Sequence, residues 1–361
     1  MNLTKKSDAF FYIDQYLDDV KYRIFSYRLA SYSDFCEPDA LESRGIMFDV
    51  TVEDKPVLVC RPFKKFFNYG ENPFTMNLDY SKFQYYMDKL DGSLISTYMH
   101  KGKLMLKTKQ SIFSEQAVAA MDWLDRPENS EMKMFAEEST RRGLTVNFEY
   151  TSPMNRVVVG YDTTKLTVIG GRSNATGELA DMSIVSGMAK LLGIDTGATL
   201  PFVKTFRTDD PEAVIKNTPS ESGIEGYVFC FQDQLVKVKT DWYVSLHRSR
   251  ESIDIPRRLF DCVIDEAADD LKQLFSTDEF LLNKIKEMEE KVIPTFNSFA
   301  RQVSDFVSEN KDLSRKDFAI KGQKELSPAL FKLVMQEYLG KPLCMKEWAK
   351  KNVELFGIRE G

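Results

Sequence analysis

The spacing of apolar residues changes near residue 250, and this change divides the chain into two parts that fold differently. Before it, short β-rich runs alternate with helical patterns, which is typical of an α+β domain built mostly from antiparallel sheet. After it, apolar residues recur at helical spacing over 259–275 and again over 280–307. We therefore expect one domain over residues 1–248 and an all-α C-terminal domain over residues 249–361.

The expected elements of the first domain follow from local patterns. Several runs have the alternating, β-branched composition of strands; they are residues 45–52, 56–60, 94–99, 104–107, 145–151, 166–170, 226–231 and 235–239. Helical spacing is found over 114–124, which begins with Ser114 as a cap, and over 184–192. In the C-terminal part, Ser327 followed by Pro328 has the form of a helix start.

The composition excludes several classes of protein. A formal net charge of -6 argues against a wholly basic surface, so a nucleic acid would have to be bound locally. With only two histidines, His100 and His247, a histidine-centred triad or metal site has almost no material. The five cysteines form no C-x-x-C pair and are expected to be core thiols; they are Cys36, Cys60, Cys230, Cys262 and Cys344.

The sequence also bears on location. Its first residues lack the uninterrupted apolar core of a signal peptide, and no apolar stretch reaches the roughly 18 residues that a membrane-spanning helix needs. We therefore expect a cytoplasmic protein with no membrane segment.

The segment Lys89-Leu90-Asp91-Gly92 presents one amine on a tight turn and suggests a lysine nucleophile. Gly92 is expected to supply a backbone angle that other residues avoid. An attacking lysine must lose its proton, which desolvation or neighbouring cations favour. Lys237 and Lys239 are candidate neighbours, and because they alternate along one expected strand they share a face. Attack on a nucleotide α-phosphate is the reaction that this arrangement suits.

A lone K-x-D-G motif is too short to identify a family, but several longer segments of the chain together resemble one. They are YRIFSYRLASYSDFCEPDALESRGIMFDV, RPFKKFFNYGENPFTMN, KLDGSLISTY, KTKQSIFSEQA, NFEYTSPMNRVVVGY, IEGYV and KVKTDWYVSLH. In this order they resemble the RNA ligase 1 family of T-even bacteriophages, within the covalent nucleotidyltransferases. The resemblance implies an antiparallel-sheet, ATP-grasp-like nucleotidyltransferase domain followed by an all-α domain.

The resemblance also implies roles for basic residues. Lys89 would be the nucleophile that forms lysyl-AMP, and Arg44 would meet the nucleotide phosphate and ribose edge. Lys65 would contact a phosphate, although the adjacent Lys64 leaves the match open, and Lys109 would act near the phosphates of the second step. Leu90 stands where the family has a glutamate, which puts that side chain's role in doubt.

Acidic and strand residues receive roles in the same way. The resemblance implies that Glu149 binds the ribose and that Glu225 holds magnesium, which prefers oxygen ligands. Lys237 and Lys239 would clamp the triphosphate. Four residues keep two possible roles. Asp91 would shape the turn or help to organise the metal shell, and Tyr243 would contact a phosphate or pack in the core. Asp269 and Asp270 would bind a second metal or simply be solvated on a helix surface.

The expected activity is joining of 5'-phosphate to 3'-hydroxyl RNA ends with ATP and Mg²⁺. The resemblance further implies a monomer that repairs cleaved tRNA anticodon loops in the host cytoplasm during phage infection, with the helical domain recognising tRNA. A DNA ligase or capping enzyme is the nearest rival, but an OB-fold barrel usually follows in those enzymes. A non-catalytic RNA-binding protein is the other rival, and it would be expected to have lost Lys89 or the Lys237 and Lys239 pair. The sequence does not single out an aromatic ring that stacks on RNA.

Overall fold

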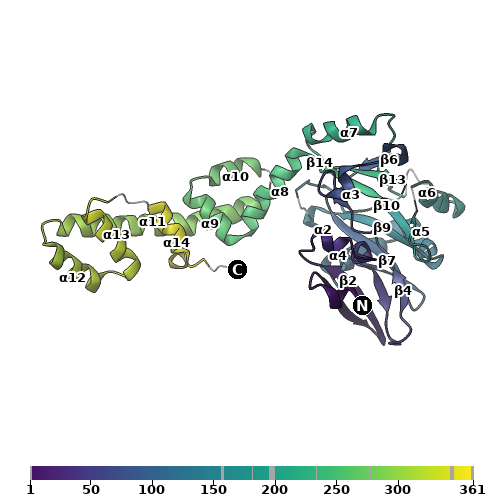
Figure 1. Cartoon of the computed structure of the whole chain (residues 1–361), viewed down its shortest axis with the longest axis horizontal. Coiled ribbons are helices and arrows are strands. Elements are labelled where there is room, and N and C mark those ends of the chain that lie inside the picture. The colour runs from purple at the N-terminus through teal and green to yellow at the C-terminus, as the bar shows by residue number, and fades with distance from the viewer. Residues whose placement is uncertain are drawn as a thin grey trace. The chain divides into compact units, whose positions relative to one another are not determined.

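The computed structural model describes residues 2–155, 158–180, 182–194, 200–232, 234–276, 278–341 and 345–358. Its contacts divide the chain into two compact units, Met1–Val244 and Ser245–Gly361. Figure 1 labels their elements. The first unit holds three β-sheets with flanking helices, and the described part of the second unit is helical. None of the described helices is long and apolar enough to cross a membrane.

The first sheet is a four-stranded antiparallel sheet in the order β1-β2-β3-β4. Its strands are β1 (Phe10–Leu17), β2 (Val20–Tyr27), β3 (Met47–Asp49) and β4 (Val57–Cys60). One face is apolar because Tyr22, Ile24 and Met47 pack in a buried cluster with Tyr98 of the next sheet. The sheet therefore has one face in the core, and its other face carries Tyr12 and Tyr16, which are exposed.

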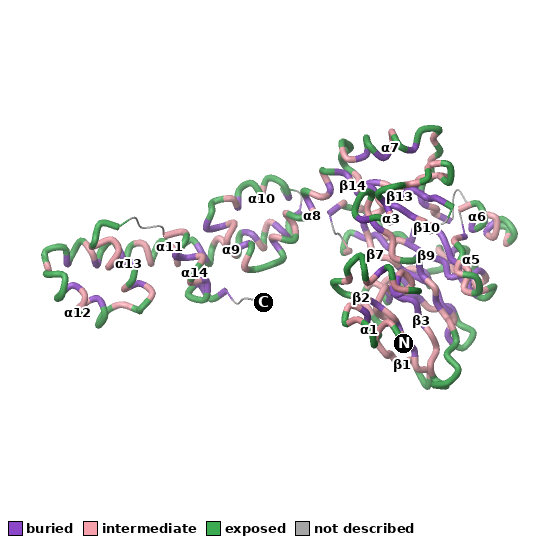
Figure 2. Tube along the Cα trace, in the orientation of Figure 1, coloured by how far each residue is buried: buried purple, intermediate pink, exposed green. Residues whose placement is uncertain are grey.

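The second sheet has the order β11-β10-β9-β7-β8 and is antiparallel. Its strands are β7 (Ser93–His100), β8 (Lys103–Lys107), β9 (Leu144–Thr151), β10 (Lys165–Ser173) and β11 (Leu179–Ala180). Helices α4 (Glu115–Leu124), α5 (Ser130–Arg141) and α6 (Met182–Leu191) supply residues to the same buried cluster as these strands. Much of these strands is drawn in purple, the colour of buried residues, in Figure 2.

The third sheet has the order β12-β6-β13-β14-β5. Its strands are β5 (Phe67–Asn68), β6 (Phe83–Asp88), β12 (Thr205–Phe206), β13 (Gly226–Phe231) and β14 (Leu235–Lys239). All pairs are antiparallel except β5 with β14, which is parallel. Short helices of this unit are α1 (Leu3–Lys6), α2 (Tyr32–Phe35), α3 (Pro73–Met76) and α7 (Pro211–Asn217).

The second unit is built from helices, three of which begin at a capping side chain. They are α9 (Pro256–Ile264), α10 (Ala268–Leu274), α11 (Glu279–Asn310), α12 (Arg315–Glu325), α13 (Pro328–Tyr338) and α14 (Met345–Lys351), and α8 (Asp241–Asp254) spans the boundary of the units. Ser327 caps α13 by accepting a hydrogen bond from the Leu330 N–H, and Pro328 occupies the first turn, where no N–H is needed.

The predicted fold class is confirmed, with mostly antiparallel sheets followed by helices. The sequence analysis did not predict β1, β2, β6, α5, α7 or α8, nor short strands such as β5, β11 and β12. The expectation of core thiols is wrong for Cys36, which is exposed, whereas Cys60 and Cys230 are buried and Cys262 is intermediate. Cys344 lies outside the described residues.

Candidate active site

Lys89 lies in the connection between β6 and β7, and its backbone is fixed to the neighbouring strand. Its N–H donates to the carbonyl of Gly226 at the start of β13, at 2.9 Å. Its side chain is only 21% exposed, and Nζ lies 2.8 Å from Oε2 of Glu225. The amine therefore faces a carboxylate in a sheltered site rather than bulk solvent.

Gly92 is required for a different reason from the one predicted. We expected a backbone angle that other residues avoid, and this is wrong, because Gly92 is absent from the described residues with positive φ. A Cβ atom at this position would instead lie 2.3 Å from the carbonyl oxygen of Tyr150. The Gly92 N–H also donates to Oε1 of Glu149 at 3.0 Å. Glycine thus allows close approach to β9 and ties the turn to a site carboxylate.

Asp91 is a buried residue whose carboxylate is occupied by protein donors. Its Oδ1 accepts from the Tyr243 hydroxyl at 2.7 Å, and its Oδ2 accepts from the N–H groups of Val158 and Val159 at 2.7 and 2.8 Å. Of the two predicted alternatives, the geometry favours the shaping of the turn over a metal shell. Leu90 packs in an apolar cluster, so its side chain supplies no polar contact in place of the family's glutamate.

Glu225 holds two lysines at once. Its side chain is 3% exposed, and it pairs with Lys89 through Oε2 and with Lys239 through Oε1, at 2.8 and 3.0 Å. A buried carboxylate needs such partners, since an unpaired charge in this setting is costly. Glu225, which was predicted to hold magnesium, therefore pairs with the Lys89 amine in this structure.

Glu149 lies on β9 and is the second carboxylate of the site. Burial raises the pKa of Glu149 to about 7, and the charge of Glu225 acts in the same direction. The charges of Lys89 and Arg44 and the Gly92 N–H oppose this rise. These interactions place Glu149, Glu225 and Lys89 in one electrostatic environment, as the sequence predicted.

This pKa predicts how the Glu149→Gln variant differs from the wild type in stability. The folded pKa of about 7 lies above the ordinary value of 4.5, so the unfolded chain ionises first as the pH rises and folding loses stability between these values. We expect the variant to gain about 1–3 kcal/mol at pH 8 and little at pH 5. Melting temperatures at both pH values check this, and an equal gain at both would contradict it.

Four further cations form a group that we call the cation cluster, defined as Arg44, Lys65, Lys109 and Lys237. None of them makes an ion pair within 4.0 Å with any described residue. Burial lowers the pKa of Lys65 and of Lys109, and each is also lowered by the nearby charge of Arg44. Burial, followed by the charges of Lys65, Lys89 and Lys239, lowers the pKa of Lys237 to about 7. Positive charge that is partly buried and has no nearby counter-charge attracts anions, so the cation cluster has the electrostatic character of an anion-binding site.

Aromatic rings lie beneath these cations. The Lys109 amine lies 4.2 Å and the Lys65 amine 5.6 Å from the ring centroid of Tyr27. The Arg44 guanidinium and the Lys237 amine lie 5.2 and 5.4 Å from the ring centroid of Phe66. Such contacts hold cations in place without neutralising them. Sequence reasoning missed Tyr27, although it alternates with Arg23 and Phe25 in the YRIFSY segment.

Lys107 is a second residue that sequence reasoning missed. It is fully buried, and its amine donates to the carbonyls of Gly45 and Thr108 at 2.9 and 2.8 Å. Burial lowers its pKa. The amine therefore joins the segments that carry Arg44 and Lys109, and its alternation with Lys109 in KTK was the available signal.

Lys239 and Tyr243 complete the site. Lys237 and Lys239 lie on the face of β14 opposite the buried Val236 and Val238, so the predicted common face is correct. The Lys239 amine lies 4.7 Å from the Tyr243 ring centroid. The Tyr243 hydroxyl donates to Asp91 and burial raises its pKa, which favours the packing alternative over phosphate contact.

Asp269 and Asp270 lie in the first turn of α10, in the second unit. Both are exposed, and Asp269 pairs with Lys272 at 2.6 Å. Their predicted role at a second metal stays a prediction. Among the described residues, no group of three or more acidic, cysteine or histidine side chains is arranged to hold a metal.

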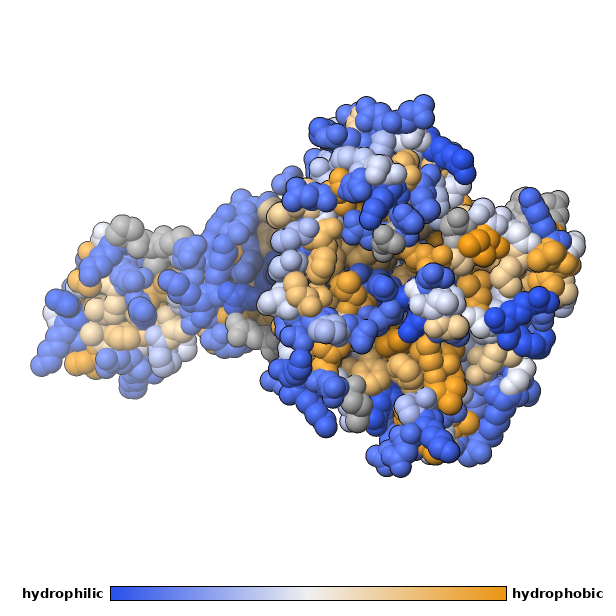
Figure 3. Space-filling model, turned by 45° about the vertical axis from the view of Figure 1, so that its right-hand side comes forward, coloured by the Kyte–Doolittle hydropathy of each residue, from blue (hydrophilic) through white to orange (hydrophobic). Residues whose placement is uncertain are grey.

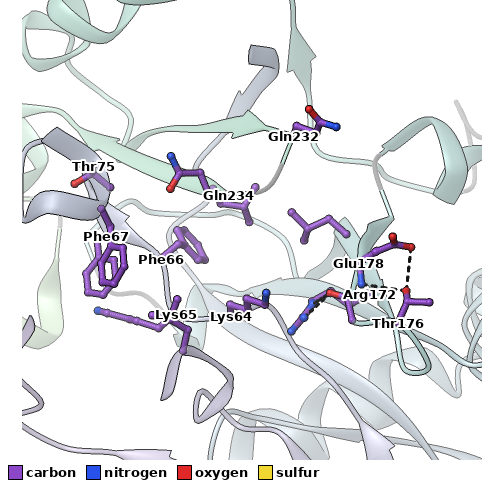
Figure 4. Close-up of a pocket in the computed structure, with 15 residues that line it drawn as sticks. Lys64, Lys65, Phe66, Phe67, Thr75, Arg172, Thr176, Glu178, Gln232 and Gln234 are labelled. Carbon is purple, nitrogen blue, oxygen red and sulfur yellow. Dashed lines mark hydrogen bonds between the residues drawn. The ribbon is translucent and has the colours of Figure 1, made fainter. Parts of the chain in front are cut away.

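A cavity of about 540 Å³ lies beside the cation cluster (Figure 4). Lys65 lines it, with Gln232 and Gln234 from the β13 and β14 side and Thr176 from the β10–β11 connection. Lys89, Glu149 and Glu225 do not line it. The candidate active site is thus defined by its side chains and not by this cavity.

Comparison with known proteins relates the chain to RNA ligases. A family described as RNA ligase matches residues 42–243, and the T4 RNA ligase 1 C-terminal domain matches residues 250–356. A Thermovibrio ammonificans protein named "Putative RNA ligase" is 28% identical over 68% of this chain and 64% of its own length. RNA ligase 1 of bacteriophage TS2126 is 26% identical over 59% of this chain and 53% of its own length.

The chain thus spans less than two thirds of the length of either relative. An archaeal ATP-dependent RNA ligase structure has a TM-score of 0.48 at 12% identity over 80% of this chain and 76% of that one, a likeness that adds nothing to the assignment. The two family matches cover the first unit's site and the helical unit in turn. On these matches, the chain belongs to the T4 RNA ligase 1 family of RNA ligases.

Proposed function

We propose that the chain is an ATP-dependent RNA ligase that joins a 5'-phosphate to a 3'-hydroxyl through lysyl-AMP and RNA-adenylate intermediates. One observation carries the proposal: a sheltered amine, Lys89, lies between two carboxylates and a cation cluster that has no counter-charge within ion-pair distance among the described residues. Family membership supports the same conclusion.

In the first step, the Lys89 nitrogen attacks the α-phosphorus of ATP. A phosphorus–nitrogen bond forms, the bond to pyrophosphate breaks, and the lysine ammonium gives up two of its three protons, one before the attack and one on formation of the phosphoramidate. Glu225 is the nearest base, with Oε2 at 2.8 Å from the amine. Lysine suits this step because an amine, unlike a guanidinium, can give up a proton near neutral pH.

The cation cluster would stabilise the charge that develops on the leaving pyrophosphate. Phosphoryl transfer depends mainly on positioning and on such electrostatic stabilisation. Arg44 offers a planar fork that suits phosphate oxygens, whereas the lysines act as point charges. Because the four cations are held against rings and buried surface, they need little rearrangement when the phosphates bind.

The two carboxylates of the site, Glu149 and Glu225, could hold magnesium, but only one of them is readily available for it. Glu149 and Glu225 offer carboxylates, and Mg²⁺ is commonly held by one or two carboxylates together with substrate phosphates and water. Both Glu225 oxygens are paired with lysines in the described structure, which leaves Glu149 as the more available ligand. When bound, the ion would supply further positive charge at the phosphates.

Lys109 is proposed to act after adenylylation. Its amine lies over the Tyr27 ring, and the charges of Arg44 and Lys65 act on it. We expect Lys109→Ala to slow sealing of a nicked RNA stem-loop at least about 10-fold more than self-adenylylation. Single-turnover assays of both steps check this, and equal losses would show that the step is misassigned. Lys103→Ala, an exposed change on β8, serves as the control.

The finer role proposed is repair of cleaved tRNA anticodon loops during phage infection by a monomeric protein, with the helical unit recognising tRNA. It is supported by the match of residues 250–356 to the T4 RNA ligase 1 C-terminal domain. We expect a chain that ends after α8 to keep self-adenylylation and to lose its preference for nicked tRNA over linear RNA. Competition between the two substrates measures this, and a preserved preference would place recognition in the first unit.

A further inference from the structure

The face of the first sheet that points away from the core carries a row of aromatic rings. Strand register places Tyr12 opposite Phe25, and Phe48 follows on β3. The ring centroids of Tyr12 and Phe25 lie 5.8 Å apart, and those of Phe25 and Phe48 lie 5.9 Å apart. Tyr12 is 39% exposed and Tyr16 is 61% exposed. Rings in contact across three strands thus remain accessible from one side.

Two cations lie over tyrosine rings of this face. The Arg23 guanidinium lies 4.0 Å from the Tyr12 ring centroid, and both of its bonds to Asp14 are 2.7 Å long. Lys21 pairs with the same carboxylate at 2.9 Å and lies over Tyr16. Asp14 therefore holds the Arg23 guanidinium beside the aromatic rings. Both guanidinium groups and aromatic rings can stack on nucleobases.

A groove of about 600 Å³ runs over this face of β2 and β3. Arg23, Phe25 and Phe48 are among its lining residues, and carboxylates from the adjoining loops line it as well; these are Asp39, Glu42 and Glu53. Lys21 and Arg61 also line the groove, so its cations and carboxylates balance, and it suits uncharged bases better than a row of phosphates. Figure 3 shows apolar surface of this kind in hollows of the first unit, edged by hydrophilic side chains.

The aromatic face of β2 extends from the groove toward the cation cluster. Ser43 lines the groove, and the next residue in the chain is Arg44 of the cation cluster. Along β2, Tyr27 follows Phe25 on the same face at a spacing of about 7 Å, and Tyr27 carries Lys65 and Lys109. The row of rings therefore ends where the phosphate-binding cations begin.

From these observations we propose that this face of the first sheet is a stacking platform for the bases of single-stranded RNA next to the end being sealed, with Tyr12 and the Arg23 plane as its exposed elements. The proposal rests on the proposed function, which makes RNA the substrate. Bases stack on the rings, while the terminal phosphate reaches the cation cluster. The platform needs no base-specific hydrogen bonds, so it accepts different sequences.

The test compares RNA binding by full-length variants in the absence of ATP. Tyr12→Ala is expected to raise the Kd for a 5'-phosphorylated single-stranded RNA by about 5- to 150-fold, the cost of losing one stacked base. Tyr12→Phe, which keeps the ring, and Val118→Ala, an exposed change on α4, are expected to bind like the wild type.

RNA with an abasic position near its 5' end makes the test specific to stacking. The abasic change is expected to weaken binding to the wild type and to have little further effect on Tyr12→Ala. An equal abasic penalty in both proteins, or an unchanged Kd in Tyr12→Ala, would overturn the platform. Unchanged RNA binding together with a changed sedimentation coefficient would assign the face to a second copy and likewise overturn it. A wild-type chain that shows the stacking behaviour but forms no adduct with ATP would reject the ligase activity alone.

Discussion

Replacing Lys89 with alanine is expected to abolish the covalent adduct that forms when the protein is incubated with α-labelled ATP and magnesium. The adduct in the wild type should be labile in acid and stable in alkali, as a phosphoramidate is. The physical reason is that nitrogen attack requires an amine at this place, and Nζ of Lys89 is the group held 2.8 Å from Glu225. Gel autoradiography measures the result.

Lys89→Arg separates charge from nucleophilicity. An arginine retains the positive charge that Glu225 requires, so the fold should be preserved, but its guanidinium stays protonated and cannot attack. We expect this variant to be inactive with a melting temperature close to that of the wild type. Labelling that persists in both variants would reject Lys89 as the nucleophile.

Replacing Lys237 with methionine is expected to slow self-adenylylation by about 100- to 1,000-fold, the usual cost of removing one preorganised charge from a phosphate site. Lys237 is the cluster member whose pKa falls to about 7, which shows how strongly its surroundings disfavour a further cation before an anion binds. A bound triphosphate would favour the charged form of Lys237 and so raise its pKa. The wild type should therefore take up a proton when ATP binds at about pH 8, and the variant should not.

Calorimetry in buffers of different ionisation enthalpy measures this proton uptake, and single-turnover labelling measures the rate. Lys103→Met, an exposed change on β8, controls for a general loss of positive charge. Equal proton uptake in the wild type and the Lys237→Met variant would show that Lys237 does not receive the proton. A near-normal rate would remove it from the phosphate site.

Alternating and helical patterns were sufficient to predict most of the fold. Strands such as β9 and β14 were predicted because apolar residues alternate along them, over eight and five residues respectively. β1 was missed because its outward positions hold aromatic residues, so polar residues do not mark the second face. α5 was missed although Met132, Phe135 and Ala136 have helical spacing and are buried.

The candidate site could be predicted only where a residue's own chemistry or a family motif marked it. Lys89, Glu149, Glu225 and Lys237 do come together, from turns and strands far apart in sequence. The sequence could not show that Glu225 pairs with both Lys89 and Lys239, because such sharing depends on how β6, β13 and β14 are aligned.

Other features depend on tertiary contacts that no motif records. Lys107 resembles any strand lysine until burial leaves its amine only carbonyls to bind. Gly92 was assigned a conformational role, yet the oxygen that excludes a side chain there belongs to Tyr150, which is remote in sequence. Such errors arise because the sequence gives the order of the residues but not their tertiary contacts.

The sharing of Glu225 has a consequence for the order of events on the protein. In the proposed reaction, adenylylation would leave the Lys89 nitrogen without its positive charge, and Glu225 would keep Lys239 as its remaining lysine partner. The charge around Glu225 would therefore differ between the loaded and the unloaded protein before RNA binds.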